Sequence, residues 1–253
     1  MTLHFDRRGE GPPLLLLHAT LSSSRQLRTL ASRLAERFTV LSVDRRGSGQ
    51  STFDGPAEPI PATTHIEDIA RLVAGEGLAP VVVVGHSYGG CIAIELASHR
   101  PELVAAVLAY EPPYALVAPA DAQAGMAEVG HRTLAARDDD GLAAAALMFM
   151  AGVSGADAVA AMSPAARARV EEAGQGAVAD ATLAGMDPDA LGRIVCPVRI
   201  ATGGGSAPFY AEIADALAGR VPTADHVRIP GLDHMAPVLR PDAIAEAVED
   251  FLA

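Results

Sequence analysis

The sequence predicts an α/β protein with a mainly parallel, doubly wound sheet and one helical insertion. Short apolar runs rich in β-branched residues alternate with helical patterns in the first part of the chain. This alternation stops near residue 112 and resumes at Val198. Half of the 253 residues are hydrophobic, which is enough to bury the core of one large domain.

The predicted strands are continuous apolar runs, as expected for strands that are buried on both faces of a sheet. They cover residues 14–17, 38–43, 81–84, 104–109, 198–201 and 226–229. The segments between them have apolar residues at helical spacing, as Leu27, Leu30 and Leu34 do. The predicted core helices cover residues 23–37, 66–74, 91–99 and 241–252.

Residues 112–191 contain no convincing strand pattern. They are rich in Ala, and helices are predicted over 122–137, 141–151, 164–172 and 177–185. The three aspartates at 138–140, followed by Gly141, predict a solvated loop that leads into a helix. The sequence therefore predicts a core formed by residues 1–111 and 192–253, interrupted by a helical segment over 112–191.

The charge balance excludes several functions. All 19 basic residues are Arg and none is Lys, so neither a lysine Schiff base nor a G-x-x-x-x-G-K-[ST] phosphate loop can form. The net charge of −12 argues against binding to nucleic acid or to an anionic membrane surface. A small-molecule substrate is the expected partner, and no pattern indicates the oligomeric state.

Cysteine usage and the N-terminus predict a cytoplasmic protein. Cys91 and Cys196 form no C-x-x-C motif and no disulfide framework. The first residues contain no apolar region typical of a signal peptide, and the apolar run at 14–17 is too short to cross a membrane.

One motif indicates nucleophilic catalysis. Ser87 is the central residue of a G-x-S-x-G sequence that follows an apolar strand and opens a helix. Gly85 and Gly89 remove side-chain clashes, so that the serine can occupy a strained turn with its hydroxyl exposed. An alternative is a glycine-rich turn with an incidental serine, but the strand and the helix on either side favour a nucleophile.

His234 is the predicted general base because it lies in a loop, 230–237, between the last strand and the last helix. His18 and His86 are interpreted as packing or oxyanion-loop residues. The remaining histidines have surface or structural interpretations: His4, His65, His99, His131 and His226.

Together, these segments resemble the α/β-hydrolase fold family over nearly the whole chain. Residues 18–20 (HAT) are similar to its oxyanion loop, 44–51 (DRRGSGQS) to its D-x-R-G-x-G-x-S loop, 85–90 to its elbow and 231–234 to its histidine loop. The resemblance implies that 112–191 is the family's cap and that the backbone N–H groups of Tyr88 and Thr20 form the oxyanion hole. Ala19 stands where the family usually has Gly, which restricts the loop if this position needs a positive φ.

The acidic member of the triad is harder to identify from the sequence. The family usually places an Asp in a G-x-x-D sequence after the strand that precedes the histidine strand, and here that position is Ser206. Glu212 and Asp215 follow, but both look helical and exposed. Glu111 lies at the end of a strand, at the edge of the sheet where such proteins bind ligands. Haloalkane dehalogenases and some lactone hydrolases take their Glu from this position, so Glu111 is the predicted acid.

The resemblance implies a serine hydrolase that needs no cofactor and no metal. Ser87 as nucleophile predicts an acyl-enzyme formed from a small carboxylic ester or lactone. Two alternatives remain open from the sequence. One is lyase, perhydrolase or oxygenase chemistry on the same fold, and the other is a ligand-binding protein without catalysis.

An apolar pocket is the expected substrate site. Its predicted lining is Leu21, Tyr114, Met148, Phe149 and Met235. Met adapts to irregular apolar surfaces, so the cap methionines are compatible with a pocket roof. The alternative interpretation is that these residues form the ordinary core of the cap.

Overall fold

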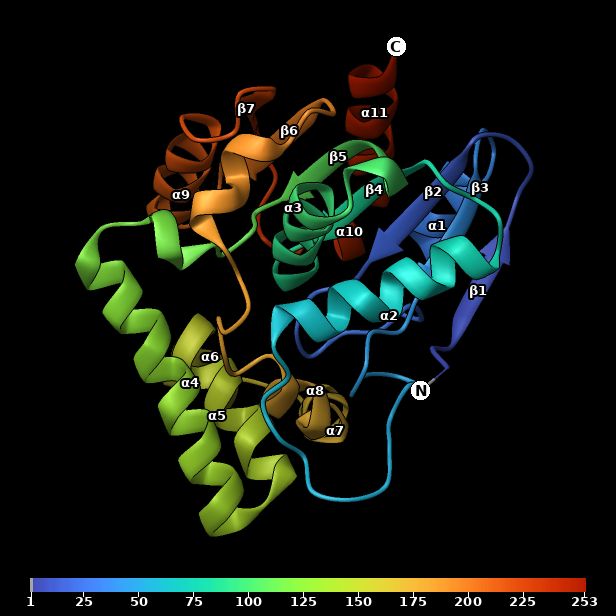
Figure 1. Ribbon diagram of the computed structural model, residues 1–253. Helices are drawn as coiled ribbons and strands as arrows, with labels where there is room; N and C mark the ends of the chain where they lie inside the picture. The colour runs from blue at the N-terminus through green and yellow to red at the C-terminus, as the bar shows by residue number, and fades with distance from the viewer. Residues whose placement is uncertain (1) are drawn as a thin grey trace.

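The structure, a computed structural model, describes residues 2–253. These residues form one seven-stranded sheet in the order β1-β3-β2-β4-β5-β6-β7 (Figure 1). The strands are β1 (Phe5–Arg8), β2 (Pro13–Leu17), β3 (Thr39–Val43), β4 (Val81–His86), β5 (Val104–Tyr110), β6 (Val198–Gly203) and β7 (Ala224–Ile229). All neighbouring pairs are parallel except β1 and β3, so the predicted mainly parallel sheet is confirmed.

Helices cover both faces of the sheet. On one face lie α2 (Ala62–Gly75), α3 (Tyr88–His99) and α9 (Pro208–Ala218), and on the other α1 (Arg28–Leu34), α10 (Ala236–Leu239) and α11 (Pro241–Leu252). Successive strand residues point to opposite faces. Leu15 and Leu17 therefore pack in the cluster that includes α2 and α3, whereas Leu14 and Leu16 pack in the cluster that includes α1 and α11.

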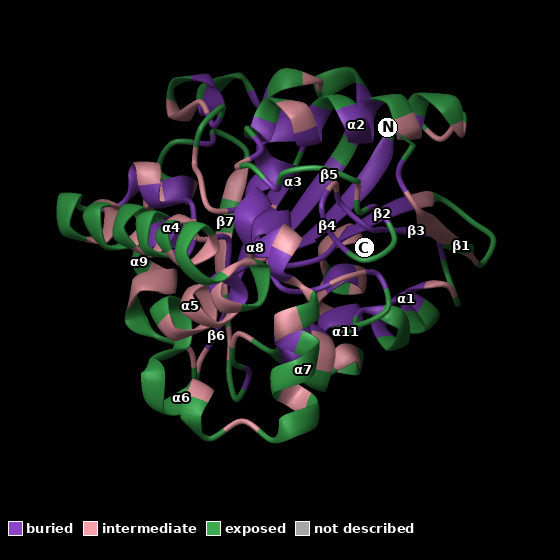
Figure 2. Cartoon of the chain, turned by 90° about the horizontal axis from the view of Figure 1, so that it is seen from below, coloured by how far each residue is buried: buried purple, intermediate pink, exposed green. Residues whose placement is uncertain are grey.

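Five further helices lie beyond the carboxyl ends of the strands. They are α4 (Ala120–Asp140), α5 (Leu142–Ser154), α6 (Ala156–Ala160), α7 (Pro164–Glu172) and α8 (Gly174–Ala179), and α5 packs against the other four. Figure 2 shows that α8 is the buried member of this group, while the outer helices are mostly exposed or half-buried. The helical character predicted for residues 112–191 is confirmed.

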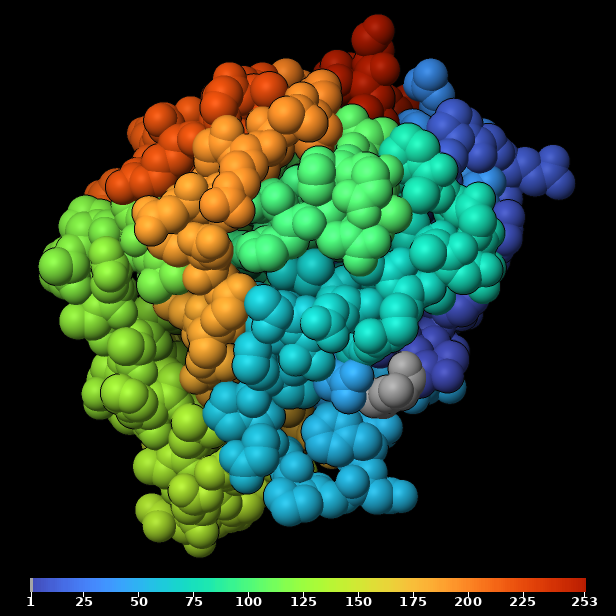
Figure 3. All heavy atoms as spheres, in the orientation of Figure 1, coloured from blue at the N-terminus to red at the C-terminus, as the bar shows by residue number. Residues whose placement is uncertain are grey.

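The chain that leaves α8 runs along the core. The Ile60 N–H donates to the Ala179 carbonyl at 2.9 Å, and the Ala62 N–H donates to the Ala184 carbonyl at 2.8 Å. Figure 3 shows this segment, in orange, between the helices at the lower left and α2 in cyan. Short 3-10 turns occur at Pro101–Leu103, Ala115–Val117 and Pro188–Arg193. None of the helices between residues 2 and 253 combines the length and the hydrophobicity needed to cross a bilayer.

Several predicted boundaries were wrong. The strand β1 was missed because its sequence, FDRR, is short and polar and is held only at an antiparallel edge. The helix predicted over 23–37 is limited to Arg28–Leu34, because the preceding residues form separate turns. The helix predicted over 177–185 is α8, which begins and ends earlier.

The aspartates at 138–140 were also misplaced by the sequence. They are the last residues of α4 and not a loop. The chain leaves the helix only at Gly141, where φ is +86°, a conformation that glycine adopts without steric cost. The three aspartates therefore form an exposed helix end, which Gly141 terminates.

Candidate active site

The register of the sheet places Ser87 and Glu111 side by side. His86 and Tyr110 are paired at the ends of β4 and β5, and Ser87 and Glu111 directly follow these two strands. The Ser87 N–H donates to the Tyr110 carbonyl at 2.9 Å. Both residues have positive φ, +53° for Ser87 and +48° for Glu111. Such strain costs about 1–3 kcal/mol per residue and is typical of functional sites.

The turn around Ser87 has no room for side chains at positions 85 and 89. A Cβ on Gly85 would lie 2.4 Å from the Gly89 carbonyl oxygen, and a Cβ on Gly89 would lie 2.5 Å from the His18 carbonyl oxygen. The prediction that small residues must flank the serine is therefore confirmed. Ser87 remains partly exposed at the start of α3, which is the placement that a nucleophile needs.

His234 is oriented by Glu111. Its Nδ1 lies 2.7 Å from Glu111 Oε2, and the other carboxylate oxygen accepts the Gly203 N–H at 2.7 Å. Glu111 is fully buried and accepts both bonds as a carboxylate. Nδ1 therefore carries the proton, and Nε2 keeps the lone pair that a general base needs.

The third contact of the triad is not closed. Within residues 2–253, no hydrogen bond joins the Ser87 hydroxyl to His234. Contacts of this kind are often long in unliganded sites and shorten when substrate binds. The structure thus brings the three predicted residues to one edge of the sheet, with the pair His234–Glu111 already formed.

The residues that precede Ser87 and Glu111, at the ends of β4 and β5, hold the histidine loop in place. His86 Nε2 donates to the His234 carbonyl at 2.8 Å, and the Tyr110 hydroxyl donates to the Asp233 carbonyl at 2.7 Å. Burial lowers the pKa of His86 well below its usual value, so the ring is a neutral donor. The sequence suggested packing or the oxyanion loop for His86, and it gave no signal for Tyr110.

The segment that usually supplies the acid has a different role here. The Gly204 N–H donates to the Ile229 carbonyl and the Gly205 N–H to the Leu232 carbonyl, both at 2.8 Å. These bonds attach the segment to the histidine loop. The Ser206 hydroxyl is buried and makes no hydrogen bond within residues 2–253.

The rival acids are exposed, as the sequence predicted. Glu212 and Asp215 lie on the outer side of α9. Asp215 Oδ1 is 2.7 Å from His226 Nδ1, so its partner is a different histidine.

Tyr210 is a site residue that sequence reasoning missed. Its ring stacks on His234 with centroids 4.7 Å apart and planes 14° apart, and its hydroxyl lies 3.4 Å from His234 Nε2. Burial raises the pKa of Tyr210 and keeps the phenol protonated. No sequence pattern indicates this contact, because it depends on how α9 packs over the histidine loop.

The backbone N–H groups of Tyr88 and Thr20 are available as hydrogen-bond donors. Tyr88 is the first residue of α3, where the N–H has no intrahelical acceptor. Within residues 2–253, neither the Tyr88 nor the Thr20 N–H donates to another protein group. Ala19 does not have a positive φ; the strained residue of this loop is Leu21, at φ +58°. The side chain of Ala19 is therefore compatible with the loop.

The predicted pocket residues are only partly assembled. Leu21 and Phe149 belong to one apolar cluster, Met148 is half-buried on α5, and Met235 is 44% exposed next to His234. The prediction for Tyr114 is wrong. This residue is fully buried, and its hydroxyl donates to Glu95 of α3, so it belongs to the core.

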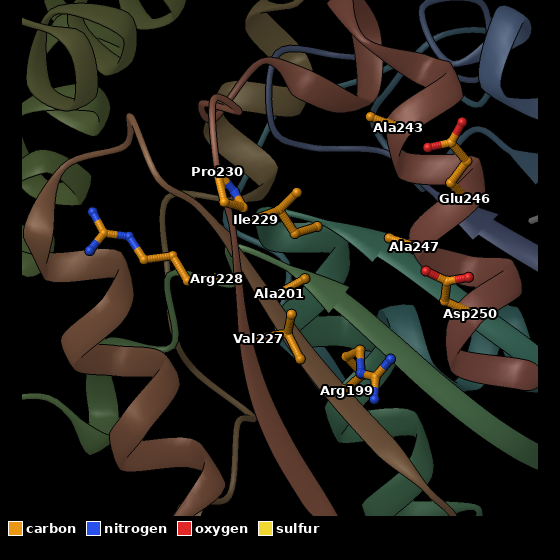
Figure 4. A pocket seen from close by; sticks show the side chains of 10 residues that line it. All are labelled: Arg199, Ala201, Val227, Arg228, Ile229, Pro230, Ala243, Glu246, Ala247 and Asp250. Carbon is orange, nitrogen blue, oxygen red and sulfur yellow. The ribbon is translucent and has the colours of Figure 1, made fainter.

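A hollow of about 290 Å³ lies elsewhere, between β6, β7 and α11 (Figure 4). It is lined by Val227, Ile229 and Ala247 among others, and by none of Ser87, Glu111 or His234. This hollow is therefore separate from the candidate active site.

Buried histidines make stability depend on pH. Burial, the largest cause, lowers the pKa of His65 from 6.5 to about 4. The unfolded chain therefore takes up a proton near pH 6.5, while the folded chain does so only near pH 4. Protonation of His65 therefore leaves the unfolding free energy unchanged above pH 6.5 and lowers it as the pH falls from 6.5 toward 4. We expect this histidine to remove roughly 2 kcal/mol of unfolding free energy between pH 7 and pH 5.

Chemical denaturation of wild type and His65→Gln at both pH values measures this contribution. The variant should lose less stability on acidification than wild type does. His131→Gln is the control, because His131 is exposed on α4. If the pH dependence of His65→Gln equals that of wild type, His65 is not the responsible group.

Comparisons with known proteins agree with the observed fold. Residues 14–247 match the model of the "Alpha/beta hydrolase family". The chain is 28% identical to an alpha/beta hydrolase from Sphaerobacter thermophilus, with a TM-score of 0.78 and coverage of 99% of this chain and 96% of that one.

Curated relatives are similar over shorter segments. A 2-(acetamidomethylene)succinate hydrolase of Mesorhizobium japonicum is 35% identical over 111 residues, which are 44% of this chain and 39% of that protein. A lipase of Mycobacterium tuberculosis is 36% identical over 116 residues, which are 45% of this chain and 43% of that protein. The chain thus matches about two fifths of the length of these relatives.

Proposed function

The chain belongs to the alpha/beta hydrolase family, and from this membership and the site geometry we propose that it is a serine hydrolase that cleaves a small carboxylic ester or lactone. The observation that carries the proposal is the hydrogen bond between the part-buried His234 and the fully buried Glu111, beside a serine in a strained strand-to-helix turn. This arrangement supplies a base, an acid that orients it and a nucleophile at one sheet edge.

The proposed reaction proceeds through an acyl-enzyme. His234 Nε2 accepts the proton of Ser87 as Oγ attacks the substrate carbonyl carbon, and Glu111 stabilises the imidazolium that forms. The N–H groups of Tyr88 and Thr20 stabilise the oxyanion, each donor contributing about 3 kcal/mol in the transition state. His234 then protonates the leaving alkoxide. In the second half it removes a proton from water, which attacks the acyl carbon, and it returns this proton to Ser87 Oγ as the bond to the acyl group breaks.

An apolar substrate fits the surroundings better than a charged one. Helix α5 has no charged residue, and its Phe149 joins Leu21 in one apolar cluster next to Thr20. One of the proteins similar to this chain is a lipase of Mycobacterium tuberculosis.

We place the cap at residues 112–191 and the protein in the cytoplasm. Its two cysteines are buried and unbonded, which supports a reducing compartment.

Intact-mass spectrometry after treatment with a fluorophosphonate tests the proposal. Wild type should gain one adduct, and Ser87→Ala should gain none. Ser206→Ala is a matched control, because this hydroxyl is buried in the neighbouring loop and should not affect labelling. No adduct on folded wild type would contradict an activated serine and favour a ligand-binding role.

A chilled pulse of an activated ester separates hydrolysis from other chemistry of the fold. We expect an acyl group on the Ser87 peptide that disappears on warming with release of the acid. Turnover without a covalent acyl group would favour a lyase or oxygenase mechanism.

A further inference from the structure

A buried carboxylate outside the triad connects the cap to the loop beside Ser87. Asp180 follows the last turn of α8, and its side chain is 1% exposed. It accepts hydrogen bonds from Arg45 Nη1 at 2.8 Å and Nη2 at 2.7 Å, and a third from the Thr20 hydroxyl at 2.8 Å. Bidentate bonds of this kind fix the geometry of both partners.

Arg45 extends this connection to the other side of Ala19. The guanidinium is fully buried, its Nε donates to the His18 carbonyl at 3.3 Å, and the Arg45 backbone N–H donates to His18 Nε2 at 3.0 Å. Its guanidinium carbon lies 5.1 Å from the centre of the Tyr88 ring. The loop 18–20 is thus held at His18 by Arg45 and at Thr20 by Asp180.

This loop lies directly against the nucleophile turn. The His18 carbonyl occupies the space beside Gly89, where an added Cβ would be 2.5 Å away. Thr20 lies two residues after His18 in this loop, and its N–H donates to no protein group within residues 2–253. An oxyanion donor acts only when it lies about 2.7–3.1 Å from the developing charge, so small shifts of this loop reduce catalysis.

We propose, on the basis of the proposed hydrolase function, that Asp180 is a positioning residue that sets the Thr20 N–H in the oxyanion hole. Asp180 does not touch the substrate; it acts through Thr20 and Arg45. Asp180 comes from the cap and Thr20 from the core. The position of α8 therefore sets the Thr20 N–H, which completes the oxyanion hole together with the Tyr88 N–H. The cap then has a role in transition-state stabilisation besides covering the site.

Kinetics of Asp180→Asn and Thr20→Val measure this role. The first variant removes the charge that holds Arg45, and the second removes only the hydroxyl bond and keeps the N–H. We expect kcat to fall about 10- to 100-fold in Asp180→Asn and about 5-fold in Thr20→Val, with KM changed less than about threefold. The Ki of a trifluoromethyl ketone, which mimics the tetrahedral oxyanion, should rise in parallel with the loss of kcat/KM.

Asp68→Asn is the matched control. Asp68 is also a buried carboxylate that accepts two bonds from an arginine, Arg46 Nε at 2.6 Å and Nη2 at 2.8 Å. None of its hydrogen bonds reaches residues 18–20. It should lose stability, as Asp180→Asn does, while kcat and the Ki of the ketone stay near wild type.

A buried arginine without its partner destabilises a protein, so Asp180→Asn can fail to fold. Arg45→Met combined with Asp180→Leu removes both charges and should show the same fall in kcat. A folded Asp180 variant with kcat within twofold of wild type, or an unchanged Ki of the ketone, would overturn the inference alone. A wild type with neither turnover nor fluorophosphonate adduct would overturn the proposed function and this inference with it.

Discussion

Replacing Glu111 with Gln is expected to lower kcat by about 10³- to 10⁴-fold while the fold is kept. The amide has nearly the same shape and can still accept the Gly203 N–H. It cannot balance the imidazolium on His234, and an amide NH₂ facing Nδ1 favours the wrong tautomer. Steady-state kinetics on an activated ester, with circular dichroism to check folding, measure the effect.

Asp215→Asn separates Glu111 from the rival acid. Asp215 is exposed and hydrogen-bonds His226, so this variant should keep wild-type turnover within about twofold. The rate of fluorophosphonate labelling should fall in Glu111→Gln and stay unchanged in Asp215→Asn. If Asp215→Asn loses turnover and Glu111→Gln does not, the assignment of the acid is wrong.

Replacing Gly89 with Ala is expected to damage both stability and catalysis. The new Cβ would lie 2.5 Å from the His18 oxygen and 2.6 Å from the Leu17 oxygen, and both are backbone atoms that cannot rotate away. Overpacking of this kind costs roughly 2–3 kcal/mol of unfolding free energy. The methyl group also pushes the loop 18–20 away from Ser87, and a displacement near 1 Å can lower kcat about 100-fold. Denaturation and steady-state kinetics measure the two losses.

Gly125→Ala is the control for the backbone effect of this substitution. Gly125 lies in α4, and an added Cβ there meets no atom within 4 Å. Alanine should stabilise that helix by about 0.5–1 kcal/mol without changing kcat. The two substitutions should therefore change the unfolding free energy in opposite directions. A Gly89→Ala variant as stable and active as wild type would contradict the close packing of the oxyanion loop on the turn.

The sequence by itself determined the α/β class, the six parallel strands, Ser87 in its turn and the position of Glu111 at a strand end. These features depend on local signals. A strand that is buried on both faces needs a continuous apolar run, and a sharp strand-to-helix turn needs glycines next to the serine. The sequence also placed His234 in the loop before the last helix, and the family resemblance added the oxyanion loop. The structure places Glu111 2.7 Å from His234, which no local pattern could show.

Only the tertiary structure decided which distant side chains meet. Tyr210 stacks on His234, and Asp180 bonds to Thr20 across most of the chain. Tyr114, predicted for the pocket, faces α3 instead. A single aromatic or acidic residue in a helix has the same local sequence whether it points to solvent, to the core or to a catalytic histidine. Its environment is set by the packing of elements far apart in sequence, and that packing has no local periodicity.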